Sequence, residues 1–470
     1  MRREILTAAL ILATLLAQPA VPHGQASGPA NAYASIDGAH LKGYVDELTA
    51  MSRRYRDQGH PQFWGRIIGT EADAENARWL LDKFKAAGLS DVRAQSFDLP
   101  PQWMPHSWKV SAAGGGQTLS LASAQPTYQG VATPAGGLDL EAVDVGFATD
   151  ADLAGRDLKG KAVFFYSMDY QSRHSTISRG AVKRLGDAGA AAIFITLLIP
   201  GNMHFQFYPV GSAVPTFALG YDDGMKMREM IGLARSRGAL ARVQLALDVA
   251  MTPNLKTATI WGTLPGATDE TVFIVAHRDG WFEAANDNGT GIATMLGLVE
   301  YFAKVPLAQR KRTIVFLGTT GHHDGTAESG SWLLQHKEVF AKTALIINCE
   351  HTAASQLIAS NNSVVRMASV ESPMSWYVGG SAALNRIVEE AYRTFDVKLL
   401  TERSASAAGE IGRIQNLAPS LQLIDTGLYW HSDRETSDLI PASGLAAVTR
   451  AYAKVVTDIG GLSLKDLQRP

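Results

Sequence analysis

The stretch that decides the fold is Val272-Phe-Ile-Val-Ala276-His277-Arg-Asp279, followed after a short loop by Asn286-Asp-Asn-Gly-Thr-Gly291. Its first five residues are apolar, as in a buried strand, and the run ends at a histidine and an aspartate. A helical pattern follows over residues 289–305. A buried strand, a polar turn and a helix in this order are typical of an α/β protein.

Three further strand-like runs follow, at residues 313–317, 344–349 and 420–424. Each is followed, within a short loop, by side chains that can bind a metal, which are in order His322 with His323, then Glu350, then His431. Ligands of open α/β sheets bind outside the carboxyl ends of the strands. We therefore expect these side chains to meet His277 and Asp287 at one sheet edge and to form a two-metal hydrolase site.

Helical patterns alternate with these strands. They cover residues 36–56, 74–86, 289–305, 330–337, 382–394 and 442–457. Alternation of this kind predicts a mostly parallel central sheet flanked by helices. The predicted fold class is α/β.

Length and charge limit the classes of protein that fit. A chain of 470 residues with 46% hydrophobic content can build two or three cores. A formal net charge of −2 and a pI near 6.6 exclude the strongly basic class of nucleic-acid-binding proteins. Cys349 is the only cysteine, so no intramolecular disulfide can form. The sequence does not indicate an oligomeric state.

The first 26 residues resemble an export signal. Arg2 and Arg3 precede an apolar run over residues 5–17, and small residues continue to about Ala26. The run is shorter than the roughly 20 residues that a membrane span needs. We expect an exported protein, periplasmic or secreted, with no membrane span in the mature chain.

Residues 101–253 differ in character from the segments on either side. They are rich in glycine, alanine and valine, carry short strand-like runs and show few helix-length patterns. This change of composition predicts a separate β-rich unit in the middle of the chain.

With these motifs in view, the chain resembles the M28 family of zinc peptidases carrying an inserted protease-associated (PA) domain. Three sets of residues carry the resemblance: Gly65-Arg-Ile-Ile-Gly-Thr70; Gly155-Arg-Asp-Leu-Lys-Gly-Lys161 with Ala188-Gly-Ala190; and Asn286 to Gly291. The resemblance implies a discontinuous peptidase domain of the zinc-exopeptidase fold over residues 27–104 and 254–470. It implies a PA insert over residues 105–253.

The resemblance also implies the role of most site residues. His277 and Glu350 would bind one zinc ion, His431 the other, and Asp287 would bridge the two. Asp279 would fix a ring or a backbone turn near His277. Two zinc ions per chain are expected, and one is possible. Read without the family, Asp287 could equally be a helix N-cap, and His277 could be an ordinary packed histidine.

The third strand departs from the family pattern. The family places two adjacent glutamates there, a general base and then a ligand, where this chain has His322 and His323. Imidazole binds zinc well, so His323 can serve as the ligand, and His322 then takes the position of the base. The alternative is that both histidines form a polar turn at an inactive site.

Other polar and aromatic residues lie near the predicted ligands in sequence. Glu328 and Glu410 could supply a carboxylate from another direction, although each is also a candidate surface residue. Trp281, Phe282 and Trp430 flank ligands and could line a substrate pocket or simply pack.

The predicted function is that of an exported M28-like metallohydrolase. It would cleave a terminal amide bond of peptides or peptide-like substrates with a metal-activated water, as an aminopeptidase rather than a carboxypeptidase. Two alternatives remain. One is a binding protein that kept the fold and lost catalysis, as the transferrin receptor has. The other is a single-metal acyl transferase resembling the glutaminyl cyclases.

Overall fold

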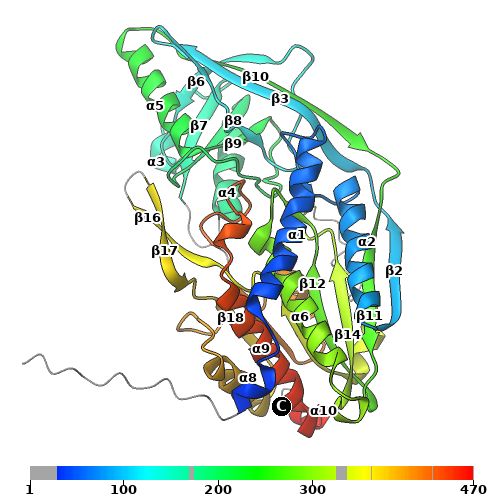
Figure 1. The fold of residues 1–470 in the computed structure, drawn as a ribbon. Coiled ribbons are helices and arrows are strands. Elements are labelled where there is room, and N and C mark those ends of the chain that lie inside the picture. The colour runs from blue at the N-terminus through cyan, green and yellow to red at the C-terminus, as the bar shows by residue number, and fades with distance from the viewer. Residues whose placement is uncertain (1–28, 169–173, 324–335, 361–362, 426, 469–470) are drawn as a thin grey trace, which may run out of the picture.

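The computed structural model describes residues 29–168, 174–323, 336–360, 363–425 and 427–468. Two large sheets organise these residues (Figure 1). A seven-stranded sheet with α1, α2, α6, α8 and α9 occupies the lower part of Figure 1, and an eight-stranded sheet with α4 and α5 occupies the upper part.

The seven-stranded sheet contains the four strands predicted at residues 272–276, 313–317, 344–349 and 420–424. Its strands in spatial order are β18 (Ser375–Gly379), β19 (Ser420–Ile424), β15 (Thr343–Cys349), β12 (Thr268–His277), β14 (Arg312–Thr319), β11 (Lys256–Leu264) and β2 (Ser90–Asp98). The four central strands β19, β15, β12 and β14 are parallel, and the three strands at the edges pair antiparallel. The parallel centre confirms the predicted fold, and the carboxyl ends of these four strands lie on the same edge.

The two faces of this sheet are covered differently. Five helices pack on one face, with Val272, Ile274 and Ala276 of β12 in their core. They are α1 (Gly38–Asp57), α2 (Glu71–Ala86), α6 (Gly291–Ala303), α8 (Ala382–Thr394) and α9 (Ala442–Asp458). Phe273 and Val275 point to the other face and pack against short 3-10 turns, η4 (Lys337–Lys342) and η5 (Gly409–Ile411). Both faces of β12 are therefore buried, as its unbroken apolar run predicts.

The eight-stranded sheet is formed by residues 102–252. Its strands in spatial order are β4 (Gln117–Ser120), β3 (Gln102–Gly114), β10 (Arg242–Thr252), β6 (Leu138–Asp144), β7 (Ala162–Ser167), β8 (Ala192–Leu197), β9 (Thr216–Leu219) and β5 (Gln125–Pro126). Two long helices, α4 (His174–Asp187) and α5 (Tyr221–Ser236), accompany it, with the short α3 (Asp150–Leu153). The sequence analysis expected few helices in this segment and did not locate these two long ones.

Shorter elements complete the described chain. They are the strand pairs β1 (Gly65–Arg66) with β13 (Gly280–Trp281) and β16 (Ser355–Ser360) with β17 (Ser363–Glu371), the 3-10 turns η1 (Pro29–Tyr33), η3 (Leu307–Gln309), η6 (Ser437–Leu439) and η7 (Ile459–Gly461), the irregular turn η2 (Ala285–Thr290) and the helix α10 (Leu464–Leu467). The predicted export signal, most of the predicted helix at 330–337 and Glu328 lie outside the described residues. Among the helices that are described, none combines the length and the apolar character of a membrane-spanning segment.

Candidate metal centre

The polar residues predicted from the sequence meet at one edge of the seven-stranded sheet. His277 is the last residue of β12, and Glu350 directly follows β15. His277, Asp279, Asp287, His323, Glu350 and His431 are each at least 97% buried. His322 is less enclosed, with 15% of its side chain exposed. The predicted site residues are therefore brought together, in the interior rather than on the surface.

Asp287 lies at the centre of this group. It sits in the irregular turn η2, where Asn288 and not Asp287 accepts the N–H of Gly291 at 3.1 Å. The alternative interpretation of Asp287 as the helix N-cap was therefore wrong, and its carboxylate is available to other groups.

Four histidines approach this carboxylate through the same ring atom, two on each oxygen. The Nε2 atoms of His277 and His351 lie 3.2 and 3.0 Å from Oδ1. Those of His323 and His431 lie 3.1 and 2.9 Å from Oδ2. His351 is a member of this group that the sequence analysis left without a role.

The opposite ring nitrogen of three of these histidines is held by an oxygen. His277 Nδ1 lies 3.2 Å from the carbonyl oxygen of Asp279, and His323 Nδ1 lies 3.0 Å from the carboxylate of Asp279. His351 Nδ1 lies 2.8 Å from the carbonyl oxygen of Asp425. An oxygen partner places the ring proton on Nδ1 and leaves the Nε2 lone pair free, which is the usual arrangement of metal-binding histidines.

A metal ion fits the groups that surround Asp287. His277 Nε2, His351 Nε2 and Asp287 Oδ1 are buried and make no hydrogen bond of acceptable geometry with any described residue, although they lie close together. Two ligand atoms at about 2.0 Å from a tetrahedral zinc ion are roughly 3.3 Å apart, close to these spacings. Sets of ligand atoms that could hold an ion occur on both oxygens, with His277 and His351 on one side and His323 and His431 on the other.

The electrostatics of the site favour a cation. Burial alone would raise the pKa of Asp287, but the imidazoles of His351 and His323 hold it well below its ordinary value. Burial would lower the pKa of His323, yet Asp287 and Asp279 raise it to about 9. Without metal, Asp287 raises the pKa of His277, His323 and His351 despite their burial and so favours protons on these rings, whereas burial lowers the pKa of His431 to about 3. A metal ion must displace these protons, so zinc binding should release protons and weaken as pH falls.

The comparisons with known proteins agree with this geometry. The model of peptidase family M28 matches residues 259–456, which include every residue of the cluster. Residues 259–456 belong to peptidase family M28. Aminopeptidase YwaD of Bacillus subtilis (strain 168) is 26% identical over 261 residues, which are 53% of this chain and 50% of that protein. The sequence match thus spans about half the length of this curated relative.

Solved structures share the fold over most of the chain. The zinc aminopeptidase BSAP from Bacillus subtilis gives a TM-score of 0.65 at 16% identity, covering 93% of this chain and 98% of that one. A peptidase M28 precursor from Shewanella amazonensis SB2B gives a TM-score of 0.69 at 20% identity, covering 92% of this chain and 100% of that one. At such identities the likeness concerns the fold, and it extends beyond the segment that the M28 model matches.

The two adjacent histidines after β14 have separate partners in this M28 site. His323 faces Asp287 and Asp279, as described above. His322 stacks on His277, with ring centroids 4.1 Å apart, and its Nδ1 lies 3.2 Å from Oε1 of Glu410. Its Nε2 lies 3.8 Å from Oε1 of Glu350. The structure thus places Glu410 beside His322, in the interior rather than on the surface.

Glu435 holds together the segments that carry Asp287 and His431, and the sequence analysis overlooked it. One of its carboxylate oxygens accepts the N–H groups of Asn286 and Asp287 at 2.9 and 2.7 Å, and the other accepts the N–H of His431 at 3.1 Å. Burial and the nearby charge of Asp287 raise its pKa to about 7. Its position four residues after His431 was the one sequence signal available.

Two buried arginines shape the chain around His277. Arg66 donates to the carbonyl oxygens of Arg278, Glu283 and Ala284, and thereby fixes the turn that leads to Asp287. Burial lowers its pKa to about 10, so it stays protonated near neutral pH. Arg278, directly after His277, forms a fully buried ion pair with Asp73 of α2. The motif that begins at Gly65 therefore holds, through Arg66, the turn between His277 and Asp287 in place.

Aromatic rings line the M28 site on the side of His323 and His431. Trp281 lies 4.7 Å from the ring of His323, and Trp430 stacks on His431 at 3.6 Å. The indole N–H of Trp430 also donates to Asp287 Oδ2 at 2.7 Å. Tyr208 lies edge-on to His431 at 4.9 Å. Phe282, the third predicted aromatic, packs instead against Trp64 at 5.4 Å.

Tyr208 belongs to a loop of the eight-stranded unit that contacts the segment carrying His431. The N–H of Gln206 donates to the carbonyl oxygen of His431 at 2.9 Å, and Phe205 forms a β-bridge with Ser432. His204 pairs with Asp433 at 2.8 Å. No local sequence pattern predicts these contacts, because more than two hundred residues separate the two segments.

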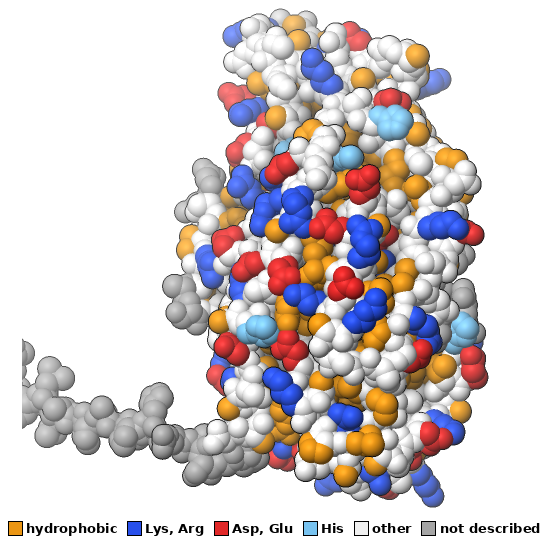
Figure 2. Space-filling view, turned by 45° about the vertical axis from the view of Figure 1, so that its right-hand side comes forward, with side chains coloured by type: hydrophobic (Ala, Val, Ile, Leu, Met, Phe, Trp, Pro, Cys, Tyr) orange, Lys and Arg blue, Asp and Glu red, His pale blue; other side chains and the backbone are white. Residues whose placement is uncertain are grey.

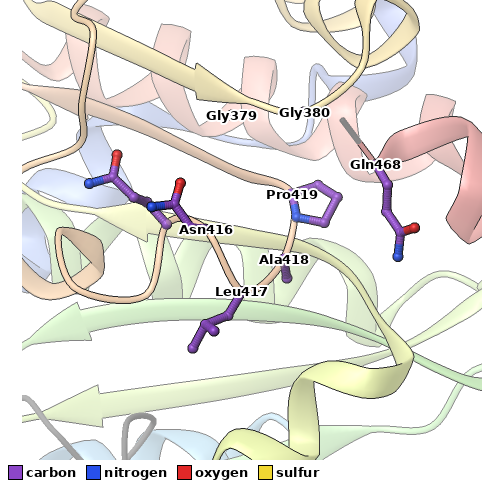
Figure 3. A pocket seen from close by; sticks show the side chains of 8 residues that line it. Gly379, Gly380, Asn416, Leu417, Ala418, Pro419 and Gln468 are labelled. Carbon is purple, nitrogen blue, oxygen red and sulfur yellow. The ribbon is translucent and has the colours of Figure 1, made fainter. Parts of the chain in front are cut away.

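A second surface feature, away from this site, lacks titratable side chains. A pocket of about 300 Å³ lies at the opposite edge of the sheet, between the end of β18 and the start of β19 (Figure 3). Its lining residues are Gly379, Gly380, Gln415, Asn416, Leu417, Ala418, Pro419 and Gln468, and none of them is titratable. On the face drawn in Figure 2, basic and acidic side chains are interspersed without a large region of one sign.

Proposed function

We infer that this chain is an exported zinc aminopeptidase that cleaves the amino-terminal amide bond of peptides or peptide-like substrates. The observation that carries this inference is the convergence of four imidazole nitrogens, in pairs, on the two oxygens of Asp287 inside an M28 domain. We assign the peptidase domain to residues 27–104 and 254–470, a PA insert to residues 105–253 and an export signal to residues 1–26.

The metal-binding groups come from this cluster. His277, Asp287, His323 and His431 would hold two zinc ions. Zinc bound there would polarise the carbonyl of the scissile amide and lower the pKa of a water molecule.

The chain supplies the proton transfers through His322. Because Glu410 accepts a hydrogen bond from Nδ1–H of His322, the Nε2 atom of His322 can accept a proton from the attacking water. The same proton can then be donated to the amine that leaves. Asp279 keeps His323 in place by accepting hydrogen bonds from its Nδ1–H and its backbone N–H.

Removal and return of metal tests this function. We expect the purified chain to hydrolyse aminoacyl arylamides, to lose that activity after treatment with a chelator, and to recover it with added zinc. The matched control is the N-acetylated form of the same substrate, which an aminopeptidase leaves intact. A chain that binds zinc and yet cleaves none of a broad set of aminoacyl arylamides would support the binding-protein alternative instead.

Replacing His322 separates catalysis from metal binding. In His322→Ala we expect unchanged zinc content and a rate reduced by about 10²–10⁴-fold, because general-base assistance contributes that much. Zinc content is measured by inductively coupled plasma mass spectrometry and the rate by the arylamide assay.

His106→Ala is the matched control for this substitution, since His106 is an exposed histidine paired with Asp248 in the eight-stranded unit. It should keep both the zinc and the rate of the unmodified chain. Full activity in His322→Ala would remove His322 from the proton transfers.

A further inference from the structure

His351 has a fixed position next to the Oδ1 side of Asp287. It directly follows Glu350, and its backbone adopts the left-handed region with φ 49°. Its N–H donates to Asn288 Oδ1 at 3.1 Å, and its ring Nδ1 meets the carbonyl oxygen of Asp425 at 2.8 Å. Positive φ is uncommon outside glycine and tends to be found at functional sites, where surrounding contacts maintain it.

The free nitrogen of this ring has no hydrogen-bond partner among the described residues. His351 Nε2 lies 3.0 Å from Asp287 Oδ1, and His277 Nε2 lies 3.2 Å from the same oxygen. All three atoms are buried, and none of them makes a hydrogen bond of acceptable geometry. They converge on a shared volume instead of pointing at one another, as ligands of one ion do.

The carboxylate of Glu350 makes its hydrogen bonds with other side chains. Its Oε2 accepts the side-chain N–H groups of Asn348 at 2.6 Å and Gln422 at 3.3 Å. Its carboxylate packs against the backbone of Gly409, leaving no room there for a Cβ. Its other oxygen lies 3.8 Å from His322 Nε2. The carboxylate therefore faces His322 and the turn η5, and among the described residues it approaches the Oδ1 side only through His277, whose ring nitrogen lies within 4.8 Å of one of its oxygens.

We propose that His351, rather than Glu350, completes the zinc position on the Oδ1 side of Asp287. This inference rests on the proposed function. It yields a centre with two imidazoles per metal ion and one bridging carboxylate, and it leaves Glu350 and Glu410 on either side of His322. Such a nitrogen-rich ligand set suits zinc and other late first-row metals and disfavours magnesium and manganese, which prefer oxygen ligands.

Two substitutions of adjacent residues test the assignment. We expect the unmodified chain to bind about two zinc ions and His351→Leu to bind about one, because one position would lose a ligand it needs for tight binding. Glu350→Gln should retain about two, because glutamine keeps the size of the side chain and an acceptor for Asn348. The probe is zinc alone, with stoichiometry from equilibrium dialysis and mass spectrometry, and circular dichroism checks the fold of both variants.

Each outcome decides the question. Unchanged zinc in His351→Leu, or loss of a zinc ion in Glu350→Gln, overturns the assignment while the zinc content and activity of the unmodified chain keep the proposed function standing. An unmodified chain that takes up no zinc overturns both.

A second measurement does not depend on a folded variant. In the unmodified chain loaded with cobalt(II), each histidine bound through Nε2 contributes one shifted, exchangeable Nδ1–H proton signal in the NMR spectrum. Four such signals are expected with His351 as a ligand, from His277, His323, His351 and His431. Three signals would overturn the proposal.

Discussion

Asp287→Asn is expected to abolish zinc binding at both positions and to reduce the rate of arylamide hydrolysis by more than about 10³-fold. The side chain supplies one oxygen to each side of the site, so a single substitution removes an anion that all four histidines share. Metal ions contribute several kcal/mol of transition-state stabilisation, and each 1.36 kcal/mol corresponds to about a factor of ten in rate. Zinc content and the arylamide rate measure the two effects.

Asp269→Asn is the matched control, since Asp269 lies on the strand that carries His277 but at its opposite end, where it is exposed and paired with Lys342. It should leave zinc content and rate unchanged. If Asp287→Asn kept even one tightly bound zinc ion, the bridging role of Asp287 would be refuted.

Asp73→Ala is expected to destabilise the chain by about 3–5 kcal/mol, because it leaves the charge of Arg278 buried without its partner. The side chains of Asp73 and Arg278 are 2% and 0% exposed. Asp73 also accepts the hydroxyl of Thr257 at 2.7 Å and the N–H of Gly69 at 3.0 Å, so the substitution removes several bonds at once. The change is measured as the shift in the midpoint of urea unfolding at constant slope.

The comparison for this experiment is Asp82→Ala on the same helix. The side chain of Asp82 is 75% exposed and lies 3.9 Å from Lys85. Exposed substitutions of this kind change stability by no more than about 0.5 kcal/mol. Equal effects of the two substitutions would show that the buried ion pair contributes no special stability.

The sequence predicted the elements whose periodicity is strong. The unbroken apolar runs gave all four central strands of the seven-stranded sheet, and α8 was predicted with its observed bounds, Ala382–Thr394. Helix α2 begins at Glu71, three residues before the predicted start, because Thr70 accepts the N–H of Asp73 and caps it.

The two helices of the eight-stranded unit were missed for a physical reason. Both contain glycine, which disfavours helices in local propensity. In α5, Gly224 packs against the side chain of Thr196 on β8, where a Cβ would clash. The residue that weakens the local helical signal is therefore needed for close packing on the sheet, which no short sequence window reveals.

The site was predictable where its residues end strands, and not where they reach it through a turn. The predicted residues His277, Asp287, His323 and His431 do converge in the structure, and Glu350 lies beside His322. His351 was passed over because its direction depends on a left-handed backbone turn. Glu410 was judged from its sequence neighbours, and its burial beside His322 depends on the position of η5 under the sheet.

The contact between the loop at 204–206 and the segment at 431–433 links the association of the two units of the chain to the binding of an ion at His431. Gln206 donates to the carbonyl oxygen of His431 and His204 pairs with Asp433, so separating the eight-stranded unit from the M28 domain also frees the segment that carries His431. Any ion bound to His431 then opposes that separation by its own binding free energy, in proportion to the logarithm of its concentration. If a metal ion binds there, its removal is therefore expected to weaken the contact between the two halves of the chain.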